Sequence, residues 1–504
     1  MNLQFSNLNL LTYLTNPIIA MKTESQQLSK ITKLPSEQML SYGTITPTQG
    51  QYKLFKLWDK FILDKTTDRL TFLLKGYAGT GKTTTVSLLV KTLPSFGYKV
   101  VLLAPTGRAA KVISAYTNRQ ASTIHRSIYK AADTETGRFI FELTTNYHKN
   151  TIFIVDESSM ITDDRDIGGN SLLSDLIEFV FESEEKNNNK LLLIGDTAQL
   201  PPVNSALSPA LEKEYLYRNY HLQVTEHLLT EVMRQESQSG ILENATFIRN
   251  QIALQEVKIK FETKLYKDIY RMTSEKLEDG LRYAYRKYGI ENSIVICRSN
   301  KSAVQFNQYI RNQIHFRDTE ITAGDYLLVV RNNYTWLPKE SPAVFLANGE
   351  FVEVMKIIRF EEKYGFRFAT LSLRLLDYPD HPYFEATVHL KTLTSYEPNL
   401  SQDDHKTIYT AVQEDYAHIT KPREKFQQIK KDAYLNALQI KFAYAMTCHK
   451  AQGGQWDIVF VEQGYLNEQM MNIEFLRWLY TALTRAIKEL YLVNFHPSFF
   501  EETK

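Results

Sequence analysis

Cysteine is nearly absent from this chain, and that scarcity excludes several classes of protein. Only two cysteines, Cys297 and Cys448, occur among its 504 residues. Two cysteines cannot supply a disulfide framework or a structural zinc site, which needs about four ligands. The sequence therefore predicts a protein of a reducing compartment, and we expect a cytoplasmic location.

Long apolar runs and a strong excess of charge are also missing. No segment contains the roughly 18 consecutive apolar residues that indicate a membrane-spanning helix, so no membrane partner is expected. The 59 basic and 57 acidic side chains leave a formal net charge of only +2. Because the protein as a whole is not basic, a surface for nucleic acid would have to be a local basic groove.

The first residues differ from the rest of the chain and predict an N-terminal extension over residues 1–44. Leu8 to Ala20 is mildly apolar, but no basic residue precedes it and polar residues interrupt it, which argues against a secretory signal. Met21 is followed by the polar stretch K-T-E-S-Q-Q, which is typical of a cytosolic N-terminus. One alternative is that Met21 is the true start of translation and that the segment before it is not part of the protein.

A complete P-loop is the most informative motif. Residues Gly76 to Thr83 read G-Y-A-G-T-G-K-T, between a short apolar run and a segment with helical spacing. In such a loop the glycines let backbone N–H groups turn toward phosphates, Lys82 reaches the β- and γ-phosphates, and the Thr83 hydroxyl binds Mg²⁺. The nucleotide-binding residues predicted here are Gly76, Ala78, Gly79, Thr80, Gly81, Lys82, Thr83 and Thr84.

Two later strands predict further groups of a nucleotide hydrolase. Thr151 to Met160 reads T-I-F-I-V-D-E-S-S-M, in which Asp156 would hold Mg²⁺ through water and Glu157 would orient the attacking water. An acidic pair can also be the solvated end of a strand, but its position after a P-loop favours catalysis. The stretch L-L-L-I-G-D-T-A-Q-L-P-P-V delivers Gln199 beside the γ-phosphate, where its amide would act as a sensor.

The alternation of strands and helices predicts two α/β units. Through residues 70–235 it indicates a parallel sheet with helices on both faces, and a second unit begins at Ser293 to Cys297. Short β-rich runs interrupt the second unit and predict an inserted small β-barrel, while the polar tract from Leu400 to Lys431 is expected to be helical or mobile. The predicted domains are 45–235 (first core), 236–290 (helical connection), 291–325 with 437–504 (second core) and 326–436 (barrel).

Between His125 and Thr151 the chain contains extra residues, 126–150, that predict a β-hairpin. The tip from Asp133 to Gly137 is rich in turn residues, and Phe139 and Phe141 share one face of the returning strand. In an ordinary hairpin both rings would pack against their own domain. The alternative is that they are exposed and available to a ligand.

The last motifs reveal a family resemblance. Tyr444 to Gly454 reads Y-A-M-T-C-H-K-A-Q-G-G, and Leu479 to Ala486 reads L-Y-T-A-L-T-R-A. Together with the P-loop, the Asp-Glu pair and G-D-T-A-Q-L-P-P-V, in this order, the chain resembles the superfamily 1 helicases. It is most similar to their 1B branch, which holds the RecD-like and Dda-like DNA helicases. The resemblance covers roughly residues 45–495, and the last three motifs are far more specific than the first two.

This resemblance implies an α/β fold of two RecA-like P-loop NTPase cores, with an inserted small β-barrel and a β-hairpin pin insertion. It implies an ATP hydrolase that uses Mg²⁺, moves 5′ to 3′ on single-stranded DNA and unwinds duplex DNA at junctions, as a monomer. A role in DNA repair or recombination would follow from the same family.

The resemblance also implies roles for residues outside the P-loop. Gln51 would read the adenine edge, although the neighbouring Gln49 is an alternative, and Arg234 and Arg485 would approach the γ-phosphate as arginine fingers. The catalytic residues are then Lys82, Glu157, Gln199, Arg234 and Arg485. The nucleic-acid-binding residues are Pro105, Thr106, Thr123, His125, Phe139, Phe141, Thr447 and His449.

Other functions remain open at this point. An RNA-directed motor of the same superfamily would share the nucleotide chemistry and differ in contacts to the 2′-OH, which no motif reports. A nucleotide-dependent nucleic-acid-binding ATPase without unwinding would not need the full set of motifs. A small-molecule kinase would not need a second α/β half.

Overall fold

The computed structural model describes residues 33–43, 46–133, 139–164, 171–182, 187–203, 205, 207–233, 239–337, 345–378 and 380–500, with side-chain positions for all of these except 131–141. Met21 and most of the predicted N-terminal extension lie outside the described residues, as does Arg234. The described end of the extension contains a short helix, α2 (Pro35–Ser41), which packs on the first core.

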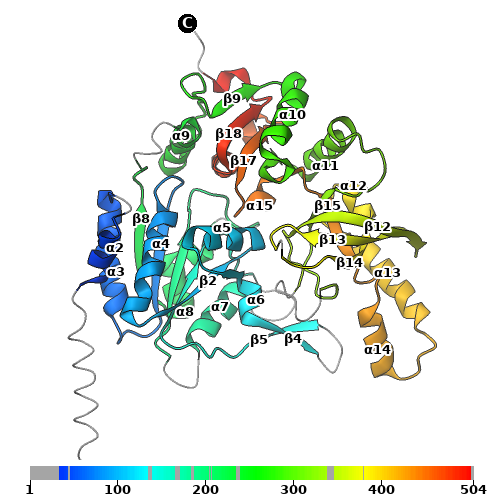
Figure 1. Ribbon diagram of the computed structural model, residues 1–504, viewed down its shortest axis with the longest axis horizontal. Coiled ribbons are helices and arrows are strands. Elements are labelled where there is room, and N and C mark those ends of the chain that lie inside the picture. The colour runs from blue at the N-terminus through cyan, green and yellow to red at the C-terminus, as the bar shows by residue number, and fades with distance from the viewer. Residues whose placement is uncertain are drawn as a thin grey trace, which may run out of the picture.

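The first core is a six-stranded parallel sheet covered by helices on both faces (Figure 1). Its strand order is β3-β2-β6-β7-β1-β8, so the P-loop strand β1 is next to the edge. Along β1 the side chains of Phe72 and Leu74 enter one apolar cluster and that of Leu73 the opposite one, as expected for a strand buried on both faces. The strands are β1 (Leu70–Gly76), β2 (Lys99–Ala104), β3 (Ala121–Thr123), β6 (Thr151–Val155), β7 (Lys190–Gly195) and β8 (Gln223–Leu229). The helices after α2 are α3 (Gln49–Leu63), α4 (Lys82–Thr92), α5 (Gly107–Thr117), α6 (Ile124–Ile128), α7 (Leu172–Phe181) and α8 (Lys213–Tyr220).

The second core contains a five-stranded parallel sheet with the order β16-β10-β17-β18-β9. Its edge strand β9 (Ile269–Met272) corrects the prediction that 236–290 is a helical connection. That segment also contains α9 (Gly240–Leu254) and α10 (Leu277–Tyr288), so the prediction was right for the helices and wrong for the strand. The other elements are β10 (Ser293–Cys297), α11 (Asn300–Tyr309), β16 (Ala445–Thr447), α15 (Cys448–Ala451), β17 (Trp456–Glu462), α16 (Ile473–Leu483) and β18 (Ala486–Val493).

The predicted insert is a closed barrel of five strands, which lies to the right of the two cores in Figure 1. Its boundary at 437 was wrong, because β15 (Leu438–Phe442) pairs with the barrel strands β11 and β14 and not with the core sheet. The polar tract before β15 is helical, as one of the two expectations had it. The elements are β11 (Tyr326–Val329), β12 (Phe351–Lys363), β13 (Phe366–Leu375), β14 (Phe384–His389), α12 (Lys391–Thr394), α13 (Gln402–Asp415) and α14 (Pro422–Lys431).

The predicted hairpin is present in the backbone. Strand β4 (Tyr129–Asp133) pairs antiparallel with β5 (Phe139–Leu143), and Figure 1 shows the pair projecting from the first core beside α6. Its tip, 134–138, and the side chains of Phe139 and Phe141 lie outside the described residues. Whether those rings are buried or exposed therefore stays a prediction.

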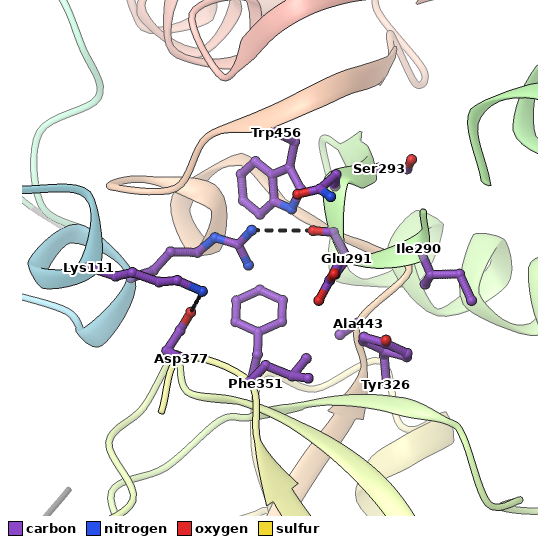
Figure 2. Close-up of a pocket in the computed structure, with 12 residues that line it drawn as sticks. Lys111, Ile290, Glu291, Ser293, Tyr326, Phe351, Asp377, Ala443 and Trp456 are labelled. Carbon is purple, nitrogen blue, oxygen red and sulfur yellow. Dashed lines mark hydrogen bonds and ion pairs between the residues drawn. The ribbon is translucent and has the colours of Figure 1, made fainter. Parts of the chain in front are cut away.

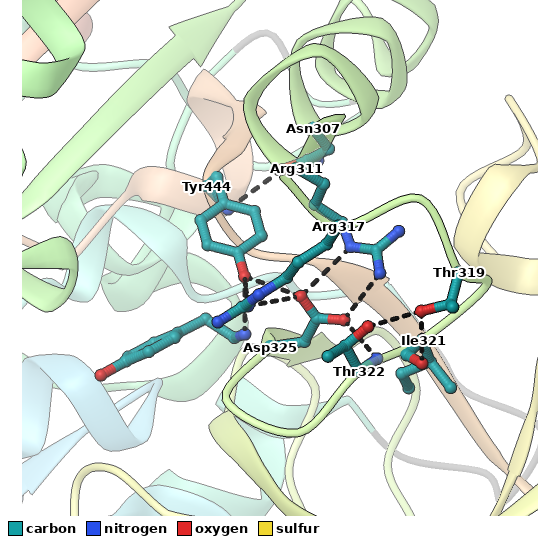
Figure 3. A network of polar contacts seen from close by, with 9 residues as sticks. Asn307, Arg311, Arg317, Thr319, Ile321, Thr322, Asp325 and Tyr444 are labelled. Carbon is teal, nitrogen blue, oxygen red and sulfur yellow. Dashed lines mark hydrogen bonds and ion pairs between the residues drawn. The ribbon is translucent and has the colours of Figure 1, made fainter. Parts of the chain in front are cut away.

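One buried carboxylate ties the barrel to the second core (Figure 3). Asp325, just before β11, accepts two hydrogen bonds from Arg311 at 3.1 and 3.0 Å and one from Arg317 at 2.7 Å. The Tyr444 hydroxyl, between β15 and β16, donates to the same carboxylate at 2.9 Å. The chain leaves the second core near Asp325 and returns to it at Tyr444. The same charge-assisted hydrogen bonds therefore stabilise both connections between the second core and the barrel.

In the part of the chain that the structure describes, no helix is both long enough and apolar enough to cross a bilayer.

Candidate nucleotide site and nucleic-acid surface

The P-loop connects the C-terminal end of β1 to the start of α4. Gly79 and Gly81 have φ values of 72° and 77°, a left-handed conformation that glycine adopts without strain. The ammonium group of Lys82 donates to the carbonyl oxygens of Gly76 at 2.6 Å and Tyr77 at 2.9 Å. The lysine therefore lies inside the cradle that the loop forms, where the sequence predicted phosphate binding.

Gln51 packs directly against this loop. It is fully buried, its amide oxygen accepts from the Thr48 backbone N–H at 3.1 Å, and its amide nitrogen donates to the Thr80 carbonyl at 3.1 Å. Both ends of the amide thus have protein partners, which would have to be exchanged for Gln51 to read an adenine. Gln49, the alternative reader, is exposed at the first residue of α3. The assignment of the adenine contact stays a prediction.

The acidic pair follows β6 as predicted. Asp156 accepts a hydrogen bond from the Tyr116 hydroxyl at 2.6 Å. Glu157 has a left-handed backbone, with φ 51° and ψ 37°, which costs a non-glycine residue about 1 kcal/mol or more. Strain of this kind is concentrated at functional sites, where surrounding structure enforces it.

Charges from both cores converge on Glu157. Burial raises the pKa of Glu157, the charge of Arg485 lowers it, Asp156 raises it further, and Lys82 lowers it. Arg485 is itself buried and donates to the Thr481 and Gly454 carbonyls at 3.0 and 3.1 Å. The structure therefore brings Lys82, Glu157 and Arg485 into one electrostatic group, whereas Arg234 lies outside the described residues.

The second core forms hydrogen bonds with the loop that carries Gln199. Arg477 of α16 donates to the Gln199 carbonyl at 3.3 Å, Thr481 accepts from the Leu200 backbone N–H at 2.9 Å, and Gln452 donates to the Leu200 carbonyl at 2.7 Å. The Gln199 side chain is buried, and its amide oxygen has no partner among the described residues. Leaving such an oxygen unpaired costs about 1–3 kcal/mol, a cost that is removed when a ligand forms a hydrogen bond with it.

Several residues that join the cores were not predicted from the sequence, namely Tyr480, Asp196, Arg477, Gln452 and Thr481. The sequence does contain a signal for them. These polar residues lie within apolar motif helices or at the ends of strands, where burying an unpaired polar group would cost free energy. Sequence alone did not show which loops they hold.

The two predicted Mg²⁺ ligands are suited to Mg²⁺ that binds as a complex with the nucleotide. Thr83 is exposed on the first turn of α4, and Asp156 stands at the end of β6. The described residues contain no group of three histidine, cysteine or acidic side chains that could hold a metal ion. Mg²⁺ in nucleotide sites takes one or two protein ligands and completes its shell with water and phosphate oxygens, so two groups suffice.

The predicted nucleic-acid-binding residues start helices. Thr106 caps α5 by accepting from the Ala109 N–H at 3.2 Å, and Thr123 caps α6 in the same way at 3.3 Å. Their elements begin where β2 and β3 end, so backbone N–H groups at both helix N-termini point to one edge of the sheet. Pro105 precedes the first cap, and His125 lies in α6.

The second core meets this edge at a glycine. Thr447 and His449 lie at the start of α15 and within it, and Gly453 follows with φ 72°. A Cβ at Gly453 would lie 3.0 Å from the Ala109 Cβ and 3.3 Å from the Thr106 hydroxyl. The two predicted nucleic-acid motifs therefore adjoin at Thr106 and Gly453, one from each core.

The barrel also packs against α5 (Figure 2). The guanidinium of Arg108 lies between the rings of Phe351 in the barrel and Trp456 in the second core, at 4.6 and 4.3 Å from their centroids. Lys111 forms an ion pair with Asp377 of the barrel at 3.3 Å. These residues line a pocket of about 170 Å³ where the cores and barrel meet.

Glu350, just before β12, places a carboxyl group at the N-terminus of α5. A Cβ at Gly107, the first residue of that helix, would lie 2.5 Å from one Glu350 oxygen. The other oxygen is buried without a partner among the described residues. Burial and, to a smaller extent, the charge of Asp377 together raise the pKa of Glu350 to about 8, while Arg126 opposes the shift. The barrel thus covers part of the predicted nucleic-acid surface with an acidic side chain.

Replacing Glu350 by glutamine should reduce the pH dependence of stability. The carboxyl group keeps its proton in the folded protein between its usual pKa of 4.5 and about 8, so unfolding releases a proton in that window. The stability that this raised pKa gives the folded protein is therefore fully present below pH 4.5. As the pH rises from there to about 8, the free energy of unfolding falls by at most about 1.4 kcal/mol per pH unit. Glutamine has the same shape and cannot ionise.

Thermal unfolding of both proteins from about pH 5 to about pH 8 tests this linkage. The melting temperature of the wild type should fall with rising pH more steeply than that of Glu350→Gln. Parallel curves would show that Glu350 is ionised in the folded protein.

Two protein families match parts of the chain. The family described as AAA domain matches residues 63–260, which contain the P-loop and the acidic pair. The family described as UvrD-like helicase C-terminal domain matches residues 442–493, which contain α15 and α16.

Similar proteins include three curated relatives. An uncharacterized protein of Methanocaldococcus jannaschii is 26% identical over 488 residues, 86% of this chain and 38% of that protein. The ATP-dependent RecD2 DNA helicase of Deinococcus radiodurans is 29% identical over 165 residues, 31% of this chain and 21% of the relative. The ATP-dependent DNA helicase dda of Enterobacteria phage T4 is 24% identical over 472 residues, 88% of this chain and 99% of the relative. The alignments thus span less than half of the first two relatives and nearly all of the third.

Among solved structures, a Pif1 helicase from Bacteroides in complex with ADP-AlF3 and ssDNA is 17% identical to this chain. The match covers 89% of this chain and 92% of that chain, with a TM-score of 0.43.

Proposed function

The chain belongs to the superfamily 1B helicases, and from this we propose that it uses ATP hydrolysis to move along single-stranded DNA and to unwind duplex DNA. The observation that carries the proposal is the convergence of Lys82 and Glu157 from one core with Arg485 from the other. A cleft whose catalytic charges come from two cores can couple nucleotide chemistry to their relative movement.

Each residue has a distinct part in the proposed reaction. Lys82 neutralises phosphate charge, Glu157 orients the attacking water, and Arg485 stabilises charge on the transferred phosphoryl group. Mg²⁺ held by Thr83 and Asp156 would supply further charge neutralisation when nucleotide is bound. Gln199, with its unpaired buried oxygen, would bond the γ-phosphate side and lose that partner after hydrolysis.

Single-stranded DNA is the proposed track. The helix N-termini capped by Thr106 and Thr123 offer backbone N–H groups to phosphates without reading sequence. The relatives named RecD2 and dda are DNA helicases, which favours DNA over RNA for this chain. Movement from 5′ to 3′, action as a monomer at duplex junctions, and a role in DNA repair or recombination rest on the 1B family alone.

The decisive experiment measures ATP hydrolysis with and without single-stranded DNA or RNA, and then unwinding of duplexes with a 5′ or a 3′ tail. We expect DNA to stimulate hydrolysis more than RNA, and 5′-tailed duplexes to be unwound. Stimulation by RNA alone would indicate an RNA-directed motor. Stimulated hydrolysis without unwinding of either duplex would indicate a translocase or binding protein, and a preference for 3′ tails would reverse the polarity.

The hairpin of β4 and β5 is proposed to separate the strands. Replacing residues 132–139 by a short Gly-Ser turn should abolish unwinding while DNA-stimulated ATP hydrolysis survives. A base stacked on an aromatic ring gains roughly 1–3 kcal/mol, comparable to the cost of opening one base-pair step, so Phe139 would suffice as a wedge.

Lys130→Ala provides a control for this prediction. Lys130 lies in the stem of the hairpin and pairs with Glu142 at 3.6 Å, with both side chains more than half exposed. We expect this variant to unwind normally, because the tip is unchanged. If tip replacement lowered hydrolysis and unwinding together, or changed neither, the hairpin would be structural.

A further inference from the structure

We propose that Tyr480 is a positioning residue for ATP hydrolysis, whose hydroxyl group fixes the P-loop to the helix that leads to Arg485. The inference rests on the proposed function and adds to it a residue from the second core that bonds the P-loop backbone.

The Tyr480 hydroxyl joins three motifs in one place. It accepts a hydrogen bond from the Ala78 backbone N–H of the P-loop at 2.9 Å and donates one to the Asp196 carboxylate at 2.6 Å. Tyr480 belongs to α16 of the second core, whereas Ala78 and Asp196 belong to the first core. Tyr480 and Asp196 are 1% and 2% exposed, so water does not compete for these bonds.

The direction of each bond is fixed. Because the hydroxyl proton goes to Asp196 in a charge-assisted bond, an oxygen lone pair is left for the Ala78 N–H. Burial raises the pKa of the Tyr480 hydroxyl well above its usual 10.0, so it keeps this proton. The other Asp196 oxygen accepts from the Ala198 N–H at 2.9 Å, which orients the carboxylate beside the loop of Gln199.

The bond to Ala78 matters because Ala78 belongs to the P-loop. Backbone N–H groups of a P-loop surround the phosphates, so the position of the loop relative to Arg485 decides how well the two together stabilise the phosphoryl group during transfer. Among the P-loop residues that the structure describes, only Ala78 donates its backbone N–H to a side chain of the second core. Thr481, the next residue of α16, binds the Leu200 N–H, and Arg485 follows four residues later. A shift of α16 therefore moves the arginine and releases the P-loop together.

The charges around the hydroxyl support a role beyond packing. Arg249 of α9 lies over the ring of Tyr77, the residue before Ala78, at 4.3 Å from its centroid. Arg477 of α16 donates to the Thr197 carbonyl. Cations from the second core thus contact both the P-loop, at Tyr77, and the loop that follows Asp196, at Thr197.

Tyr444 provides a matched control for a purely structural hydroxyl. It is also 1% exposed, and its hydroxyl also accepts from a backbone N–H, that of Tyr326, at 3.2 Å. It likewise donates to a buried carboxylate, that of Asp325, at 2.9 Å. The Tyr444 hydroxyl also accepts from Arg317 at 3.0 Å. It lies at the crossing between barrel and second core (Figure 3), and its bonds reach no P-loop residue.

The test compares Tyr480→Phe with Tyr444→Phe in the full chain, using ATP hydrolysis without DNA so that the result does not depend on unwinding. We expect both variants to lose a similar amount of thermal stability, because each leaves a backbone N–H and a carboxylate oxygen without that partner. Tyr480→Phe should lower kcat by about tenfold or more while the KM for ATP and the Kd for ADP change less than about threefold. Its affinity for ADP–aluminium fluoride, a mimic of the transferring phosphoryl group, should fall by the same factor as kcat. Tyr444→Phe should change none of these constants.

Equal kcat values for the two variants, or a loss of ADP affinity as large as the loss of kcat, would overturn the proposal. If Tyr480→Phe did not fold, Asp196→Asn would replace it, because the amide keeps the shape and removes the charge that orients the hydroxyl. The failure of the proposed function has a different signature, since the wild type would then hydrolyse ATP without stimulation by DNA or unwinding.

Discussion

Lys82→Ala should lose ATP hydrolysis by about a thousandfold or more and keep its fold, because it removes charge from the phosphate site and almost no packing. The Lys82 ammonium has no ion pair among the described residues and bonds only the carbonyl groups of Gly76 and Tyr77. We therefore expect the melting temperature to stay within about 2 °C of the wild type.

Lys91→Ala is the control for this prediction. Lys91 lies on the last turn of the same helix, α4, and its side chain is exposed. The substitution removes one positive charge from the same element without touching the P-loop. Hydrolysis assays and thermal unfolding on both variants measure the effect. A folded Lys82→Ala protein with turnover near that of Lys91→Ala would refute the P-loop assignment.

Strands next to motifs could be predicted from the sequence because they are buried on both faces. β1, β6 and β7 are short apolar runs, and each is followed directly by a motif with a catalytic or nucleotide-binding role. The strand and its function could therefore be predicted together. Strand β9 reads I-Y-R-M, which has neither an apolar run nor a motif, and only its pairing with β18 makes it a strand. Strand β15 was visible as a strand, but periodicity does not say which sheet a strand joins.

The same limit applies to the site. The sequence predicted Lys82 and Glu157 because their chemistry requires particular residue types within recognisable motifs, and the family resemblance implied Arg485. It did not predict the bond between Ala78 and Tyr480, which are 402 residues apart in the chain. Glu350 was missed for another reason, since its environment is created only when the barrel docks on α5. Contacts between separately folded units depend on their docking, which no local pattern encodes.

The predicted hairpin shows an intermediate case. Its two strands followed from turn residues and alternation, and the register from Tyr129 with Leu143 to Asp133 with Phe139 confirms them. The function of its aromatic residues depends on what stands opposite the tip. That partner is a DNA junction in our proposal and is not part of the chain.

Glu157→Gln should differ from Lys82→Ala in kind, because it leaves phosphate binding intact and removes the group that orients the attacking water. Hydrolysis should fall by about 10² to 10⁴, the usual contribution of a positioned base. ATP and single-stranded DNA should both still bind, and the variant should hold DNA more tightly in ATP than the wild type does. The reason is that opening of the cleft follows hydrolysis, which this variant completes slowly.

The pH dependence of hydrolysis separates Glu157 from a merely structural residue. Burial raises the pKa of Glu157, and the base must be ionised to act, so wild-type hydrolysis should be complete above this pKa and fall as pH decreases through it. Glutamine does not titrate, and the residual activity of Glu157→Gln should lack that decline. Glu178→Gln, on the exposed face of α7, is the control and should keep the wild-type profile. Rapid hydrolysis by Glu157→Gln, or an unchanged acidic limb in its profile, would assign the water-orienting role to another group and leave the strained backbone of Glu157 without a catalytic reason.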